Sequence, residues 1–141
     1  MKNIKSIDPI SLETKELHKI LLSSIAPRPI AFASTVDSNG NVNLSPFSYF
    51  NVFSSNPPIL IFSPSRRVRD NTTKHTLENA IETKEVVINV VNFPIVEQMS
   101  KSSVEYEKGV NEFIETGLTQ VKSLLVTVSY THLTLPTILR V

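Results

Sequence analysis

The sequence contains no cysteine and no tryptophan, and only three of its 141 residues are glycine. Without cysteine the chain cannot form disulfides, thiolate nucleophiles or cysteine-ligated zinc sites. So few glycines nearly exclude a Walker A loop or a G-x-G-x-x-G turn, and the sequence has neither. No apolar run approaches the roughly 18 residues that a membrane span needs, so we expect no membrane partner. We predict a cytoplasmic protein.

Charge of either sign is also modest, with 14 basic and 13 acidic residues and a formal net charge of +1. This balance gives no support for general nucleic-acid affinity, and we expect no nucleic-acid partner. With three histidines in the chain, we expect no metal site. No G-x-S-x-G elbow is present, and His18 and His75 lack a serine and carboxylate arrangement, so we expect no catalytic triad. Apolar residues make up 40% of the sequence, enough for one domain with a modest core.

Periodicity and turn residues predict a β-rich α+β domain built from hairpins. We expect strands at 29–36, 42–46, 59–62 and 86–91. We expect helices at 73–83, 94–100 and 110–115, and a first helix for which Ser11 is the candidate cap. The strand at 59–62 is expected to be buried, and helix 73–83 is expected to place Leu77, Ala80 and Ile81 on one face.

The last fifteen residues, 127–141, include a run that resembles a foreign sequence. The run from Val128 to Thr137, VSYTHLTLPT, resembles the translation of a transposon-end adapter used in sequencing libraries. The alternative is an ordinary threonine-rich, β-prone tail. Because ten consecutive residues match the adapter, we expect one native domain at 1–126 that breaks off at its C-terminal edge, and a non-native tail at 127–141.

The densest positive charge lies between Ser63 and Thr76, where a strand ends and a helix begins. The candidate anion-binding residues are Ser63, Ser65, Arg66, Arg67, Lys74 and Thr76. Lysine in the first turn of a helix is ordinarily unfavourable, so its presence suggests that a bound dianion offsets the repulsion. A solvated basic loop is the alternative; a nucleic-acid patch is a weaker one because Asp70 and Glu78 interrupt the charge.

A second segment, from Asn43 to Asn56, alternates aromatic residues with small hydroxyl and amide residues. Such a segment can line a flat heteroaromatic ring, with apolar faces on the ring and polar groups at its edge. The alternative is a core strand followed by a turn. The segment includes Asn43, Ser45, Pro46, Phe47, Ser48 and Phe50. Taken together, a ring site and a phosphate site are what a phosphorylated flavin requires.

Several ordered blocks now resemble a known family. They are RPIAFAST at 28–35, NLSPFSYFN at 43–51, Ser54 with NPP at 56–58, SRR at 65–67, KHTLEN at 74–79, EVVINV at 85–90 and EFIETGLT at 112–119. In order and spacing they resemble the flavin reductase-like, FMN-binding split-barrel family, most closely its flavoredoxin-type branch. The family pattern has aspartate where this chain has His75.

The resemblance implies a split β-barrel with peripheral helices, incomplete at its C-terminus, and a homodimer in the full-length form. It implies FMN as cofactor and NAD(P)H as electron donor. The residues that match the segment around the flavin ring are Ser45, Pro46, Phe47, Ser48 and Phe50, and Asn43 is a further candidate. Those that match the loop near the phosphate and ribityl chain are Ser63, Ser65, Arg66 and Arg67, and Lys74 and Thr76 match the helix start at the phosphate. The expected activity is that of a flavin reductase or flavoredoxin-like electron carrier. A flavin-binding module without reductase turnover and a basic-loop interaction protein without cofactor remain alternatives.

Overall fold

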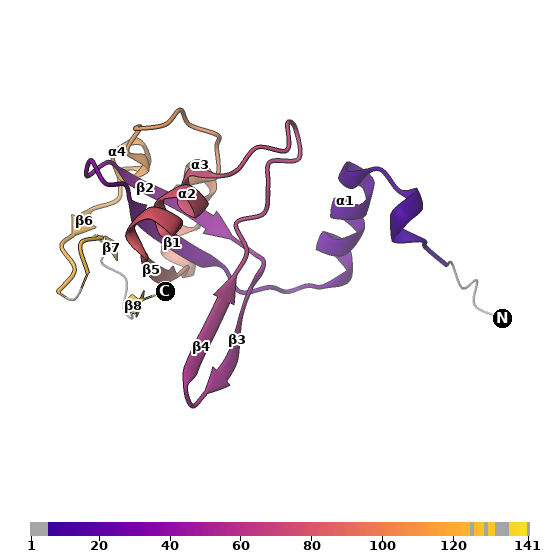
Figure 1. Cartoon of the computed structure of the whole chain (residues 1–141), viewed down its shortest axis with the longest axis horizontal. Helices are drawn as coiled ribbons and strands as arrows, with labels where there is room; N and C mark the ends of the chain where they lie inside the picture. The colour runs from indigo at the N-terminus through magenta and orange to yellow at the C-terminus, as the bar shows by residue number, and fades with distance from the viewer. Residues whose placement is uncertain (1–5, 125, 129, 132–135, 141) are drawn as a thin grey trace.

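A four-stranded antiparallel sheet with strand order β2-β1-β5-β8 lies at the centre of the fold (Figure 1). The computed structural model describes residues 6–124, 126–128, 130–131 and 136–140. The sheet strands are β1 (Ala31–Val36), β2 (Val42–Phe47), β5 (Glu85–Val90) and β8 (Pro136–Arg140). The remaining short elements are η2 (Phe93–Ile95), β6 (Gln120–Val121) and β7 (Tyr130–Thr131).

The turn between β1 and β2 forms around an aspartate. The Asp37 carboxylate accepts hydrogen bonds from the backbone N–H groups of Asn39 at 2.9 Å and Asn41 at 2.8 Å. It also accepts one from the Asn41 side-chain amide at 2.9 Å, and these bonds lower the pKa of Asp37. Gly40 has a φ of 86°, which glycine adopts without steric cost. The turn fixes the register that pairs Thr35 with Asn43.

Helices cover both faces of the sheet. Ala31 and Ala33 of β1 point to the face covered by α2 (His75–Thr83), where Ala80 packs on them. Phe32 points to the opposite face and packs against Phe113 of α4 (Glu112–Thr116), next to α3 (Val96–Ser102). Phe32 is fully buried. Successive β1 side chains therefore belong to two cores, as the alternation of a strand requires.

The prediction for the helix at 73–83 is correct in type and partly wrong in its details. The helix begins at His75, and Ala80 contacts the core as expected. Ile81, however, is 59% exposed, and the fully buried positions of α2 are Thr76 and Asn79. Polar side chains replace the expected apolar stripe because they find hydrogen-bond partners on the sheet, as described below.

β3 (Phe50–Ser55) and β4 (Pro58–Phe62) form a separate two-stranded hairpin that projects from the sheet (Figure 1). The strand predicted at 59–62 is present, but its expected burial is wrong: Ile59 is 40% and Ile61 50% exposed. Phe62, at the base of the hairpin, does pack against the core. An apolar run indicates a strand without showing which element will cover it.

The first helix, α1 (Thr14–Ser24), has no buried residue and stands apart from the sheet (Figure 1). It begins after Glu13, so the prediction that Ser11 caps it is wrong. Ser11 instead ends a short 3-10 helix, η1 (Pro9–Ser11). Within the described ranges, no helix is both long enough and apolar enough to cross a membrane.

The segment expected to be a non-native tail contributes to the sheet where it is described. β8 pairs with β5 along five residue pairs, and the Val128 side chain is buried with Val36 and Val87. Residues 129, 132–135 and 141 lie outside the described part of the chain. The non-native origin of this segment stays a prediction.

Candidate functional site

Three hollows adjoin one another where β2, the loop at 63–74 and α1 face each other. The first and second share Arg67 as a lining residue, and the second and third share Tyr49 and Leu21. We call them the cationic hollow, the loop hollow and the apolar hollow. The shared residues make the three hollows neighbours, and we call the set the track.

The cationic hollow has a volume of about 40 Å³ and lies between β2, the start of α2 and the segment after α3. Its lining residues are Asn43, Ser45, Arg67, Lys74, His75, Thr76, Ser102, Ser103, Val104, Glu105, Tyr106 and Glu112. Five of these were predicted from the sequence as binding residues.

A chain of hydrogen bonds positions the first turn of α2 in this hollow. With its amide nitrogen facing α4, Asn43 donates to Glu112 Oε1 at 3.2 Å and accepts from Thr76 Oγ1 at 2.9 Å. Glu112 Oε2 accepts the backbone N–H of Leu44 at 2.9 Å, on the edge strand β2. Burial raises the pKa of Glu112, whose hydrogen bonds act in the opposite direction. One carboxylate therefore connects α4, β2 and α2.

A second polar contact holds α2 on the sheet further along the helix. The Asn79 side chain donates to Thr35 Oγ1 at 3.2 Å, and both residues are buried. Buried polar groups without such partners are costly, so these pairs explain why polar residues occupy the inner face of α2.

Lys74 and Arg67 bring two positive charges to the hollow. Lys74 Nζ lies 5.2 Å from the centroid of the Phe47 ring, a cation–π contact. Burial, followed by repulsion from Arg67, lowers the pKa of Lys74. The same two causes lower the pKa of His75. Positive charge is thus held here against its own repulsion, which an anion would relieve.

The arginine-rich loop is internally bonded. Arg67 donates to Thr72 Oγ1 at 3.1 Å and to the Thr73 carbonyl, and Arg66 donates to the Asn71 carbonyl at 2.8 Å. Asp70 accepts hydrogen bonds from the Thr72 hydroxyl at 2.6 Å and its N–H at 3.0 Å. Together with a hydrogen bond from Arg69, these lower the pKa of Asp70 to about 2.

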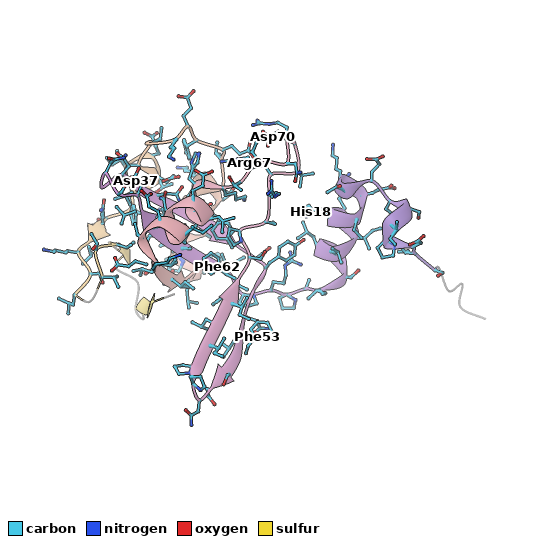
Figure 2. All side chains as sticks on the ribbon, in the orientation of Figure 1. His18, Asp37, Phe53, Phe62, Arg67 and Asp70 are labelled. Atoms are coloured by element: carbon cyan, nitrogen blue, oxygen red, sulfur yellow. The ribbon has the colours of Figure 1, made fainter. Side chains whose placement is uncertain are left out.

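The loop hollow, of about 620 Å³, separates this loop from α1. His18 on α1 and Tyr49 form one wall, with His18 Nδ1 3.2 Å from Tyr49 Oη. Figure 2 shows His18 on the side of α1 that faces the rest of the molecule, with Arg67 and Asp70 on the loop nearby. Ser65 and Arg66 line the same hollow.

The apolar hollow, of about 380 Å³, lies between α1 and the base of the β3–β4 hairpin. Phe50, Phe53 and Ile61 supply apolar surface, while Ser48 and Ser63 supply polar groups. In Figure 2, Phe62 lies at the base of the hairpin and Phe53 farther along it. Apolar walls with a few polar groups suit a flat ring.

The structure brings ten of the twelve predicted binding residues into this track. They are Asn43, Ser45, Arg67, Lys74 and Thr76 in the cationic hollow, Ser65 and Arg66 in the loop hollow, and Ser48, Phe50 and Ser63 in the apolar hollow. Pro46 and Phe47 line none of the three. Phe47 is 4% exposed and packs at 5.4 Å from the Phe62 ring, so it supports Lys74 from the core.

Sequence reasoning missed Glu105 and Glu112, the two carboxylates of the cationic hollow. Both come from the segment after α3, which reaches the hollow only through tertiary packing. Glu112 lies in the sequence block EFIETGLT, which contributed to the family resemblance but gave Glu112 no binding role. Among the described residues, no three histidine or acidic side chains converge as metal ligands would.

Known proteins resemble this chain in sequence and in fold. A family model described as flavin reductase like domain matches residues 22–137. The chain belongs to this family. An uncharacterized protein from Aquifex aeolicus (strain VF5) is 43% identical over 110 residues, covering 78% of this chain and 56% of that protein.

Two solved structures share the fold. Nitrilotriacetate monooxygenase component B from Bacillus cereus superimposes with a TM-score of 0.87 at 30% identity, covering 94% of this chain and 64% of that one. A putative flavin reductase with a split barrel domain from Shewanella frigidimarina NCIMB 400 gives 0.73 at 31% identity, covering 88% and 60%. The predicted family and α+β split-barrel class are confirmed. The flavin reductase-like chain spans less than two thirds of the length of each of these proteins.

Proposed function

We propose that this chain binds FMN along the track of three hollows, with the phosphate in the cationic hollow and the ring toward the apolar hollow. The observation that carries the proposal is that the loop hollow shares lining residues with both the cationic hollow and the apolar hollow. Lys74, Arg67 and Thr76 converge at one end, and Phe50, Ser48 and Ser63 line the other. Membership of the flavin reductase like family supports the flavin as the ligand class.

The residues present fit a phosphorylated flavin. Lys74 carries a half-buried charge with a lowered pKa, which a phosphate dianion would raise. Arg67 presents a guanidinium whose side chain is only 14% exposed, and Thr76 lies in the first turn of α2, with its hydroxyl donating to Asn43. At the other end, backbone and serine groups beside Phe50 suit the polar edge of a ring. The two carboxylates oppose the anion, but burial favours the neutral form of one of them, Glu112.

We further propose that electrons pass from a nicotinamide donor, NADH or NADPH, through the flavin to an acceptor. The isoalloxazine supplies the redox chemistry when it is bound. The chain's own residues hold the phosphate, orient the ring and shield it from water, so no side-chain acid or base is assigned. The supports for this step are the family and the oxidoreductase names of the similar structures.

A homodimer, a cytoplasmic location and the absence of a nucleic-acid partner belong to the same proposal. The β3–β4 hairpin exposes Val52 and Phe53 at more than 60% each, and an isolated two-stranded hairpin is marginally stable in water. A second copy of the chain would cover this surface. Pairing of Arg67 and Arg69 with Glu105 reduces the cationic surface that a nucleic acid would need.

The test is the visible absorbance spectrum of the purified chain after FMN addition and desalting. We expect a retained flavin band, which anaerobic NADH or NADPH bleaches. A retained band that neither donor bleaches would favour a flavin-binding module without reductase turnover. A colourless protein after desalting, together with no measurable FMN affinity at equilibrium, would contradict the flavoprotein proposal.

A further inference from the structure

Glu105 holds a negative charge within the group of cations at the proposed phosphate site. Its Oε1 lies 3.6 Å from Arg67 Nε, and its Oε2 lies 3.0 Å from Arg69 Nη1. Its charge also raises the pKa of Lys74, against the larger effects of burial and Arg67. One carboxylate thus interacts with three cations.

This carboxylate belongs to a loop on the opposite wall of the cationic hollow. Glu105 follows α3, while Arg67 and Arg69 belong to the loop before α2. The Glu105 side chain is 45% exposed, so it can turn toward solvent without moving the backbone around it. A phosphate that enters the hollow would encounter the Glu105 carboxylate beside Arg67.

We propose that Glu105 competes with the flavin phosphate for Arg67 and Lys74, and thereby weakens FMN binding and speeds its exchange. The inference rests on the proposed function, because it deepens the role of the same site. A carboxylate and a phosphate are alternative partners for the same guanidinium, since each binds its planar fork. When the phosphate occupies that position, Glu105 loses its ion pair with Arg67 and repels the new anion.

The size of the effect follows from the exposure of the pairs. Arg69 is 72% exposed and Glu105 45%, and exposed ion pairs contribute little. Arg67, at 14% exposed, makes the less screened contact. We therefore expect removal of the Glu105 charge to tighten FMN binding by about fivefold, and not by orders of magnitude.

The experiment compares Glu105→Gln with the unmodified chain, using FMN and riboflavin as ligands in fluorescence titrations. Riboflavin has the same ring and lacks the phosphate. We expect about fivefold tighter FMN binding, unchanged riboflavin binding, and a slower FMN dissociation rate in stopped flow. Glu107→Gln is the matched control: it removes the same charge from the same loop, at an exposed position that lines none of the hollows. It should leave FMN affinity unchanged.

The outcomes separate this inference from the proposed function. Unchanged or weaker FMN binding in Glu105→Gln would overturn the competition and would indicate that Glu105 only orders the two loops. An equal change for FMN and riboflavin, or an equal effect of Glu107→Gln, would overturn it as well. Failure of the unmodified chain to bind FMN would contradict the proposed function and this inference together.

Discussion

The replacement of Lys74 by methionine tests the assignment of the phosphate end most directly. Methionine keeps an apolar stem of similar length above Phe47 and removes only the ammonium group, which lies 5.2 Å from the ring centroid. A hydrogen bond to a charged partner contributes about 1.5–3 kcal/mol. Taking about 2 kcal/mol, FMN affinity should fall by about 30-fold, since about 1.4 kcal/mol corresponds to tenfold.

The same replacement should change protein stability little. It removes a cation–π contact of about 0.5–1 kcal/mol. It also removes the desolvation of a half-buried charge and its repulsion from Arg67, the two causes that lower the pKa of Lys74. These effects have opposite signs, so we expect the free energy of unfolding to change by less than about 1 kcal/mol.

The assay is a pair of equilibrium titrations with FMN and riboflavin, accompanied by urea unfolding. Lys122→Met is the control, because Lys122 is exposed and lines none of the three hollows. An equal loss of affinity for both flavins would refute the reasoning, because it would mean that Lys74 supports the ring and not the phosphate. FMN affinity within a factor of three of the unmodified chain would place the phosphate elsewhere.

Four further predictions concern pH, strain, assembly and surface. Lys74, whose pKa lies below 10.5, should lose its proton as pH rises toward that value, so FMN affinity should decline there; a Lys74→Arg variant should keep its affinity across the same titration. Lys84→Gly should raise the free energy of unfolding in urea by about 0.5–1 kcal/mol, because Lys84 has a φ of 60° at the end of α2. Phe53→Ser should halve the molecular mass measured by sedimentation equilibrium if the hairpin forms the proposed dimer contact. A variant that stays dimeric would contradict the assignment of the hairpin to that contact. Ile81→Glu should change stability by no more than about 0.5 kcal/mol, because Ile81 is 59% exposed, and a larger loss in thermal melts would show that its side chain is covered.

Local chemistry made much of the sheet predictable. The Asp37 turn carries its own hydrogen-bond acceptor and a glycine at the position of positive φ, so the sequence around it determines the β1–β2 hairpin. Gly117 likewise ends α4 with a φ of 71°, as expected for a glycine after a short helix. In both cases the decisive contacts lie within five residues of each other.

Contacts between distant segments were not predictable in the same way. The apolar periodicity of α2 favoured Ile81 as an inner residue, but Thr76 and Asn79 are buried because Asn43 and Thr35 accept their hydrogen bonds. A pattern of apolar residues contains no information on such polar pairs, whose members lie more than thirty positions apart. The carboxylates of the cationic hollow were missed for the same reason.

Two features of the cationic hollow are unfavourable for the protein alone. Lys74 stands at the start of α2 without a side-chain cap, where lysine opposes the helix dipole. Burial and Arg67 lower the pKa of both Lys74 and His75. A bound dianion would offset the repulsion between these positive charges, because it attracts each of them. The resemblance predicts aspartate at position 75, where this chain has histidine. A carboxylate there would repel a bound phosphate, and a neutral imidazole would not.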